Sequence, residues 1–193
     1  MPFRLSFENP PAGRTATASV SDTDIPLSCN STITPQCLLD LYHIPSTKAT
    51  QPSNNLGVVG FGGEWAEYSD LVTFLAAYRP DLKGSTFGLQ SVIGGTNNQS
   101  TEDGGFEASL DIQYTVGLAS GVNVTYISVG GFGLITPWPA LVDALMNETF
   151  PPQVITISYG SQESELATSD SNTAFLMYVR FLPQTLRFEP FRQ

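Results

Sequence analysis

The sequence predicts an α/β fold in which a mostly parallel sheet carries helices on both faces. Strands are predicted at 56–63, 122–129 and 154–159. The first of these runs is apolar without alternation and is closed by glycines, as expected of a parallel strand that is buried on both faces. Segments with helical spacing separate these runs, so strands and helices alternate along the chain. With 193 residues, the chain can bury one good core, and a single domain is the default expectation.

The first ordered element predicted is a short helix at 34–42. Thr34 suits its N-cap and Pro35 its first helical position, because a helix leaves its first N–H groups without partners. Residues 1–28 are rich in Pro, Ser, Thr and Ala and follow no period. We interpret 1–28 as a linker or as the remnant of a preceding segment.

Three more helices and one more strand complete the predicted order. A helical period starts near Tyr68 and stops at Arg79-Pro80, since proline ends a helix. A strand is expected around 87–93, within a polar surface stretch at 84–105. Residues 104–120 carry too many apolar positions for one stripe, so we expect a helix that is buried on most sides. The last predicted helix is 139–147.

The charge balance excludes several kinds of partner. Eight Lys and Arg residues stand against 18 Asp and Glu, a formal net charge of −10. Nucleic acids and anionic membranes both require clustered cations, so we expect neither as a partner. No apolar run is long enough to span a membrane, and the N-terminus lacks the pattern of a signal peptide. We therefore expect that a segment upstream is missing.

Sequons and cysteines favour a secreted glycoprotein. Two cysteines, Cys29 and Cys37, have a spacing compatible with a small disulfide loop, the alternative being two reduced buried thiols. Four stretches fit the N-glycosylation acceptor pattern. Their acceptors are Asn30, Asn98, Asn123 and Asn147. Secretion is the expected localisation, with a vacuole or lysosome as the alternative, and the low isoelectric point suits an acidic medium.

Several familiar kinds of chemistry find no support. Both G-x-G segments lack the third glycine of a dinucleotide fingerprint. The only histidine, His43, is interpreted as a surface or capping residue, so neither a Ser-His-Asp triad nor a zinc site of Cys and His is expected. We predict no metal ligands in this chain.

Glu107 and Asp111 remain as the candidate for acid–base chemistry. At positions i and i+4 of a helix, the two carboxyls share one face, and like charges so placed oppose ionisation. Burial acts in the same direction, which suits a general base that works in acid. The alternatives are an exposed acidic face, or a carboxyl that is hydrogen-bonded to Ser109 or Tyr114.

The letters around this pair carry a family resemblance. Residues 106–114, Phe-Glu-Ala-Ser-Leu-Asp-Ile-Gln-Tyr, resemble the G-x-E-A-S-L-D-x-Q-Y helix of the sedolisins, the serine-carboxyl peptidases that include tripeptidyl peptidases. Ile33-Thr34-Pro35 and Ile157-Ser158-Tyr159-Gly160 agree with the family in the same order, so the match covers about 33–170. The resemblance implies a subtilisin-like fold.

The same resemblance implies roles for particular residues. Glu107 would take the proton of a nucleophilic serine, and Asp111 would orient Glu107. The backbone of Ser158, Tyr159 and Gly160 would pair with an extended peptide substrate as an added strand.

Other parts of the family pattern are not found in the sequence. These are the G-T-S-x-S-like nucleophile segment, the A-S-G-D-S-G-like oxyanion segment and the C-terminal calcium site that the family implies. We do not assign the oxyanion role to Asp170. We therefore interpret 29–173 as the N-terminal part of a peptidase domain whose C-terminal half is missing, and 174–193 as an atypical tail.

The function expected is a fragment of a secreted, acid-acting serine-carboxyl endopeptidase or tripeptidyl peptidase, inactive alone and without a cofactor. The alternative is a non-catalytic secreted glycoprotein that binds peptides or a partner through the same cleft.

Overall fold

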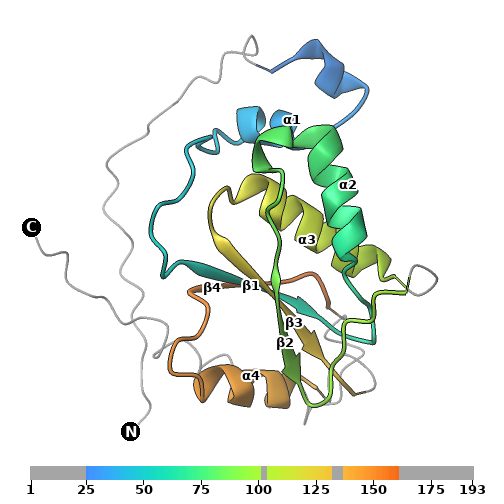
Figure 1. Cartoon of the computed structure of the whole chain (residues 1–193), viewed down its shortest axis with the longest axis vertical. Coiled ribbons are helices and arrows are strands. Elements are labelled where there is room, and N and C mark those ends of the chain that lie inside the picture. Colours follow the sequence, from blue (N-terminus) through green and yellow to red (C-terminus); the bar gives the residue numbers. More distant parts are fainter. Residues whose placement is uncertain (1–24, 101–103, 132–136, 161–193) are drawn as a thin grey trace, which may run out of the picture.

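The structure, a computed structural model, describes residues 25–100, 104–131 and 137–160 (Figure 1). The predicted tail at 174–193, Asp170 and the predicted linker at 1–28, apart from 25–28, lie outside these residues. The described elements, in chain order, are η1 (Leu27–Asn30), α1 (Pro35–Leu41), β1 (Asn55–Gly60), α2 (Tyr68–Tyr78), η2 (Pro80–Leu82), β2 (Gly88–Val92), α3 (Phe106–Leu118), β3 (Asn123–Val129), α4 (Trp138–Met146) and β4 (Val154–Ile157).

The four strands form one parallel sheet in the order β2-β3-β1-β4. β1 pairs with β3 along its whole length, Asn55 opposite Asn123 and Gly60 opposite Ser128, and with β4 on its other side. β1 and β3 are thus central, whereas β2 and β4 form the edges of the described sheet. The predicted α/β class with a parallel sheet is confirmed.

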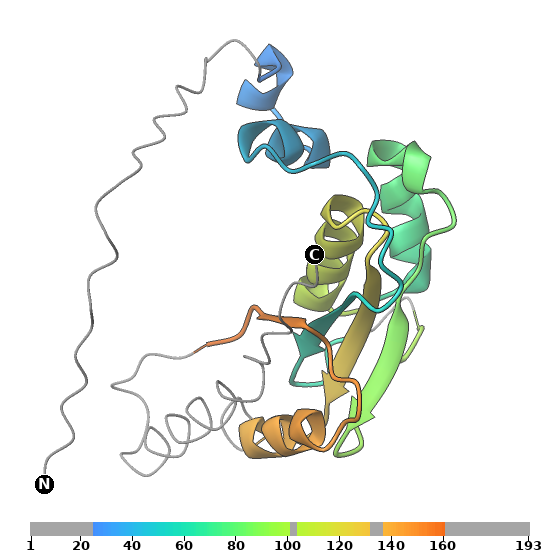
Figure 2. The same ribbon diagram turned by 90° about the vertical axis from the view of Figure 1, so that its left-hand side faces the viewer.

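Helices cover both faces of this sheet, because neighbouring residues of β1 point in opposite directions. Val58 packs in a cluster with Leu71 of α2 and Ile112 of α3. Val59 packs in a second cluster with Leu141 of α4. In Figure 1 and Figure 2, α2 and α3 lie in the upper half of the molecule and α4 lies at its lower end.

The N-terminal helices are held by a cap and a disulfide. The hydroxyl of Thr34 accepts the Cys37 N–H at 3.4 Å, and Pro35 occupies the first helical position of α1, as predicted. Cys29 and Cys37 form a disulfide, so the alternative of two reduced thiols does not apply. This bond joins η1 to α1.

The expectation that the helix at 104–120 is buried on most sides holds only in part, since Phe106 and Leu110 are exposed and the other residues of α3 are buried or half-buried. Ala108, Ile112 and Val116 of α3 are buried, but the Phe106 side chain is 88% exposed and Leu110 is 42% exposed. The number of apolar residues suggested burial all round. Their arrangement matters more, since Phe106 and Leu110 lie one turn apart on a face that the described residues leave open.

A buried arginine ties α2 to the C-terminal end of α3. Arg79, only 5% exposed, donates to both carboxylate oxygens of Asp81, at 2.9 Å and 2.8 Å. It also donates to the Gly117 carbonyl and, at 3.0 Å, to the Ser120 hydroxyl. These contacts fix the distance between the two helices that cover one face of the sheet.

Within the described part of the chain, no helix is both long enough and apolar enough to cross a membrane.

Candidate active site

The candidate site lies at the carboxyl edge of the parallel sheet. In open α/β sheets, ligands bind in the crevice beyond the carboxyl ends of the strands, at the point where the chain switches direction. Here the helix after β1 covers one face of the sheet, whereas α4, which follows β3, packs on the other. Since β1 and β3 are neighbours, the switch lies between them. The N-terminus of α3 is at the same edge because α3 follows β2.

Glu107 and Asp111 lie in the first turns of α3 and are both partly buried. The structure brings Asp111 to the end of β4, where the Ser158 hydroxyl donates a hydrogen bond to Asp111 Oδ1 at 2.8 Å. Two segments that are 47 residues apart therefore meet at this carboxyl. Of the hydrogen-bonded alternatives weighed for the pair, neither Ser109 nor Tyr114 donates to Asp111 within the described residues.

The surroundings of Asp111 favour its neutral form. Burial raises the pKa of the Asp111 carboxyl, the Ser158 hydrogen bond lowers it, and the nearby carboxyls of Glu107 and Glu64 raise it further, so the pKa lies above its ordinary value. The other oxygen, Oδ2, is buried and has no hydrogen-bond partner among the described residues. A carboxyl with one free buried oxygen is ready to hold a proton.

Glu64, which the sequence reasoning missed, anchors the N-terminus of α3. Its Oε2 accepts the N–H groups of Glu107 at 3.0 Å and of Ala108 at 3.1 Å. A carboxylate suits this place, because the first N–H groups of a helix have no partners within it and carry a partial positive charge. Glu64 thereby places Glu107 beside the end of β1. The contact spans 43 residues, and no local pattern points to it.

Two tyrosines complete the frame around Glu64. The Tyr126 hydroxyl donates to the Glu64 carbonyl at 2.7 Å. A side chain at Gly60 would collide with that hydroxyl, which explains a glycine at the end of β1. Tyr159 packs edge-on against Phe61 with ring centroids 5.5 Å apart, and burial raises the pKa of its hydroxyl.

The predicted substrate segment follows directly from an edge strand. Ser158, Tyr159 and Gly160 come immediately after β4, which pairs with β1 on one side. Tyr159 Oη lies 3.5 Å from Glu64 Oε2, and Ser158 contacts Asp111, so two of the three residues reach the carboxyl cluster. Around Gly160, no atom of the described residues lies within 4 Å of the place a side chain would take.

The other predicted sites are distributed over the surface. The four sequon asparagines, Asn30, Asn98, Asn123 and Asn147, are all exposed. Across 25–100, 104–131 and 137–160, no group of three or more His, Cys, Asp or Glu side chains could hold a metal ion. The calcium site implied by the resemblance belongs to a segment that the sequence does not show, so its prediction stays untested.

Comparisons with known proteins identify similar chains. No protein-family model matches the sequence. The tripeptidyl-peptidase SED4 of Arthroderma otae is 32% identical over 192 residues, covering 88% of this chain and 32% of the relative. The probable tripeptidyl-peptidase SED4 of Trichophyton verrucosum is 32% identical with the same coverage. The tripeptidyl-peptidase SED2 of Arthroderma otae is 35% identical over 160 residues, covering 74% of this chain and 27% of the relative. The chain thus spans about a third of the length of the curated relatives it matches.

Proposed function

The chain is a homologue of the tripeptidyl-peptidases of the sedolisin family over most of its length, and from this premise we propose that it carries the acid–base part of a peptide-hydrolysing site. Glu107 acts as the general base that takes the proton of a serine nucleophile. Asp111 orients Glu107 and shares its proton. The serine and the oxyanion carboxyl come from a segment that is not recognisable in this sequence.

The contact between Asp111 and Ser158 carries this proposal. A hydrogen bond of 2.8 Å holds the carboxyl helix against the end of the edge strand, so the base and the predicted substrate segment lie in one place. Holding the reacting groups in a fixed geometry is a large part of catalysis. A merely solvated acidic face would not join a second element in this way.

The electrostatics of the pair suit an acidic medium. At low pH a histidine base would already be protonated, whereas a carboxyl stays competent. Because the pKa of Asp111 is raised, Asp111 keeps its proton to higher pH than an exposed aspartate would. One carboxyl can then remain ionised as the base while its partner holds the proton.

The substrate proposed is an extended peptide that adds to β4. An edge strand offers unpaired N–H and C=O groups to a further strand, and Ser158, Tyr159 and Gly160 continue β4 towards Asp111. Cleavage is either endoproteolytic or tripeptidyl, and the relatives, which are named tripeptidyl-peptidases, favour the second mode. Secretion, N-glycosylation and an acidic compartment are parts of the same proposal, and no cofactor takes part in it.

A chimaeric enzyme tests the role of Glu107. Residues 25–160 would replace the matching segment of the tripeptidyl-peptidase SED4 of Arthroderma otae, which supplies the rest of the enzyme, and release of a tripeptide would be measured across acidic pH. In the chimaera, Glu107→Gln should lower kcat/KM by roughly 100-fold or more, the usual contribution of a general base. Asp143→Asn, an exposed carboxyl on α4, is the matched control. Full activity of the Glu107→Gln chimaera would sink the proposal.

The chain alone separates the enzyme fragment from the non-catalytic alternative. We expect the chain of 193 residues not to hydrolyse peptides, because an activated nucleophile and an oxyanion donor are both needed. A non-catalytic peptide-binding glycoprotein would also be inactive alone. The two hypotheses differ in the chimaera that carries residues 25–160: it should be active if the chain is an enzyme fragment and inactive if the chain is a non-catalytic protein. Cleavage by the chain alone would show that the nucleophile lies within it.

A further inference from the structure

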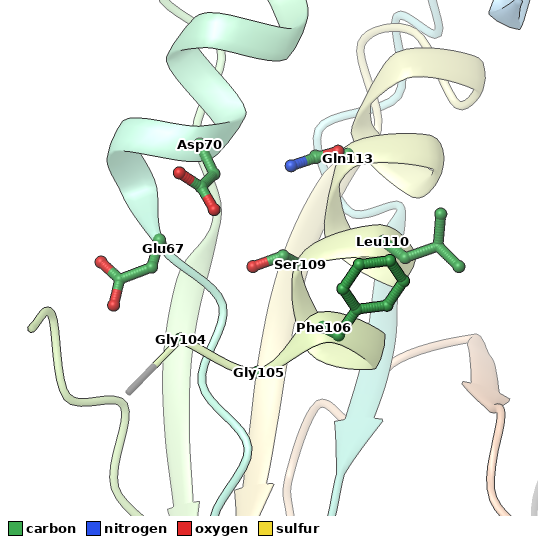
Figure 3. Close-up of a pocket in the computed structure, with 8 residues that line it drawn as sticks. All are labelled: Glu67, Asp70, Gly104, Gly105, Phe106, Ser109, Leu110 and Gln113. Atoms are coloured by element: carbon green, nitrogen blue, oxygen red, sulfur yellow. The ribbon is translucent and has the colours of Figure 1, made fainter. Parts of the chain in front are cut away.

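A pocket lies on the side of α3 that faces α2, away from Ser158. It has a volume of about 300 Å³, in the range of ligand-binding cavities, and is formed by the N-terminal turns of both helices. Asp70, Ser109 and Gln113 contribute polar groups, and Phe106 lies at its rim (Figure 3). Ser109 is two positions away from both Glu107 and Asp111, which is about 200° around a helix, so Ser109 projects on the other side of the helix.

Glu67 makes this pocket unusual. Its side chain lines the pocket although the residue is only 5% exposed, and its Oε1 has no hydrogen-bond partner within the described residues. Glu67 is also the N-cap residue of α2, yet its side chain does not cap the helix. Burying an unpaired carboxylate oxygen is costly, and native proteins rarely leave such a group without a partner. The oxygen is therefore explained most directly by a donor that comes from outside.

A second unpartnered group points to the same donor. The Ser109 hydroxyl is buried and unpaired, and it lines the same pocket. Together with the Asp70 carboxylate, it gives acceptors on two helices. The pocket has two carboxylates and, among its lining residues, no basic side chain. A ligand that fits must be positively charged and must carry several donors.

The rim defines the remaining part of the ligand. Phe106 is 88% exposed and Leu110 is 42% exposed, and both line the pocket. A long side chain with a charged head packs its methylene stem against such apolar surface, and an aromatic ring can also attract the cation itself. A guanidinium has five donors in a planar fork, which suits acceptors that are spread over two helices better than the compact ammonium of lysine does.

We propose that the pocket between α2 and α3 binds an arginine side chain of a peptide or protein partner, with Glu67 as its principal acceptor. Glu67 and Asp70 hold the guanidinium, Ser109 accepts a further hydrogen bond, and Phe106 covers the stem. The site is separate from the Glu107 and Asp111 pair and does not depend on the role proposed for that pair.

Binding of capped arginine to the whole chain tests the proposal. N-acetyl-arginine methylamide and the peptide Ala-Ala-Arg-Ala-Ala would be titrated into the labelled chain and followed by amide NMR shifts. We expect the shifts to centre on 67–70 and 106–113. The citrulline analogue, in which a neutral urea group replaces the charged guanidinium, should bind at least tenfold more weakly. Free arginine should also bind more weakly, because its own carboxylate faces an acidic pocket.

Three variants make the result specific. Glu67→Gln should weaken binding of the capped arginine at least tenfold, whereas Asp143→Asn on α4 should leave the affinity unchanged. Gln113→Lys places a cation at the pocket and should abolish binding of the capped arginine. Because residue 113 is only partly buried, this variant should fold, and it tests the proposal even where Glu67→Gln prevents folding. Glu107→Gln should not change the affinity for the capped arginine. Failure of the arginine-binding proposal would therefore leave the proposed role of Glu107 as a base unaffected.

Equal affinity for the arginine and citrulline probes would overturn the proposal. Unchanged binding by Gln113→Lys would do the same, as would shifts that are confined to the end of β4 and the Asp111 face of α3.

Discussion

The Ser158 hydroxyl donates to Asp111 Oδ1 at 2.8 Å and so joins the end of β4 to the first turns of α3. This is the only hydrogen bond that reaches the Asp111 carboxyl among the described residues, and it acts against the burial that raises the Asp111 pKa. A hydrogen bond to the ionised form of a carboxyl lowers its pKa. Burial is the main cause of the raised Asp111 pKa, and the Ser158 hydrogen bond limits how far that pKa rises.

Replacing Ser158 should raise the pKa of Asp111. In Ser158→Ala the donor is lost, while burial and the carboxyls of Glu107 and Glu64 still oppose ionisation. The Asp111 pKa should therefore lie further above its ordinary value than in the unaltered chain, because a hydrogen bond to the ionised carboxyl favours the ionised form. Carbon-detected NMR titration of the Asp111 carboxyl measures it directly.

The control for this titration is Ser69→Ala, at an exposed position of α2, which should leave the Asp111 titration unchanged. A lower pKa in Ser158→Ala would mean that the hydroxyl does not act as a donor to the ionised carboxyl.

Removing the Glu64 carboxylate should destabilise the N-terminus of α3. Glu64→Ala leaves the N–H groups of Glu107 and Ala108 without their acceptor. We expect a loss of about 1–2 kcal/mol in the free energy of unfolding, as for the loss of a helix cap. Urea unfolding measures the loss, and amide exchange at residues 107 and 108 should accelerate.

Two comparisons sharpen the Glu64 result. Glu64→Gln keeps an acceptor oxygen and should recover part of the stability, while Asp143→Ala on the surface of α4 should change it by less than about 0.5 kcal/mol. Equal stability of Glu64→Ala and the unaltered chain would show that water replaces the carboxylate at no cost.

The local elements could be predicted from the sequence because their signals are local. Thr34 and Pro35 start α1 where expected, and the helix from Tyr68 ends at Arg79-Pro80. The spacing of Glu107 and Asp111 also placed both carboxyls on one helix face. Each of these inferences needs only a few neighbouring residues.

The contacts that build the site could not be predicted, because they join residues far apart in the chain. Glu64 reaches Glu107 across 43 residues, and Ser158 reaches Asp111 across 47. Glu64 stands in a glycine-rich turn, which gives no sign that its carboxylate caps a later helix. The exposed face of α3 was missed for a related reason, since apolar content does not say which side a sheet covers.

The four sequons should differ in glycan occupancy. Asn123 begins β3, which is paired on both sides, and its amide donates to the Pro52 carbonyl at 3.0 Å. Asn30 and Asn98 lie outside the strands. When the chain is expressed in a eukaryotic secretory host, Asn30→Gln and Asn98→Gln should each remove one glycan, and Asn123 should be occupied only in part. The intact mass of each variant before and after deglycosylation gives the number of glycans. Full glycosylation at Asn123 would by itself contradict the prediction.

Replacing the buried Arg79 should destabilise the contact between α2 and α3. Arg79→Met keeps much of the stem but leaves the Gly117 carbonyl and the Ser120 hydroxyl without their donor. Buried polar groups without partners cost about 1–3 kcal/mol each, so a loss of at least about 2 kcal/mol is expected. Chemical unfolding measures the loss. A change below about 0.5 kcal/mol would indicate that the guanidinium contributes little beyond its packing.

Asp81, the acidic partner of Arg79, should contribute less than Arg79 to the free energy of unfolding, and only while its carboxyl is ionised. Its side chain is 54% exposed, so solvent screening limits the pair, and Asp81→Asn should cost less than about 1 kcal/mol.

The Arg79 hydrogen bond holds the pKa of Asp81 below 3.8, its ordinary value. A carboxyl with a lowered folded-state pKa stabilises the fold above its unfolded-state pKa, and this contribution disappears as the pH falls through the folded-state value. The difference in unfolding free energy between the unaltered chain and Asp81→Asn should therefore be constant from neutral pH down to about pH 5 and shrink below 3.8. Urea unfolding at a series of pH values measures it, and a difference that instead grows towards acid would show that the Asp81 pKa is raised.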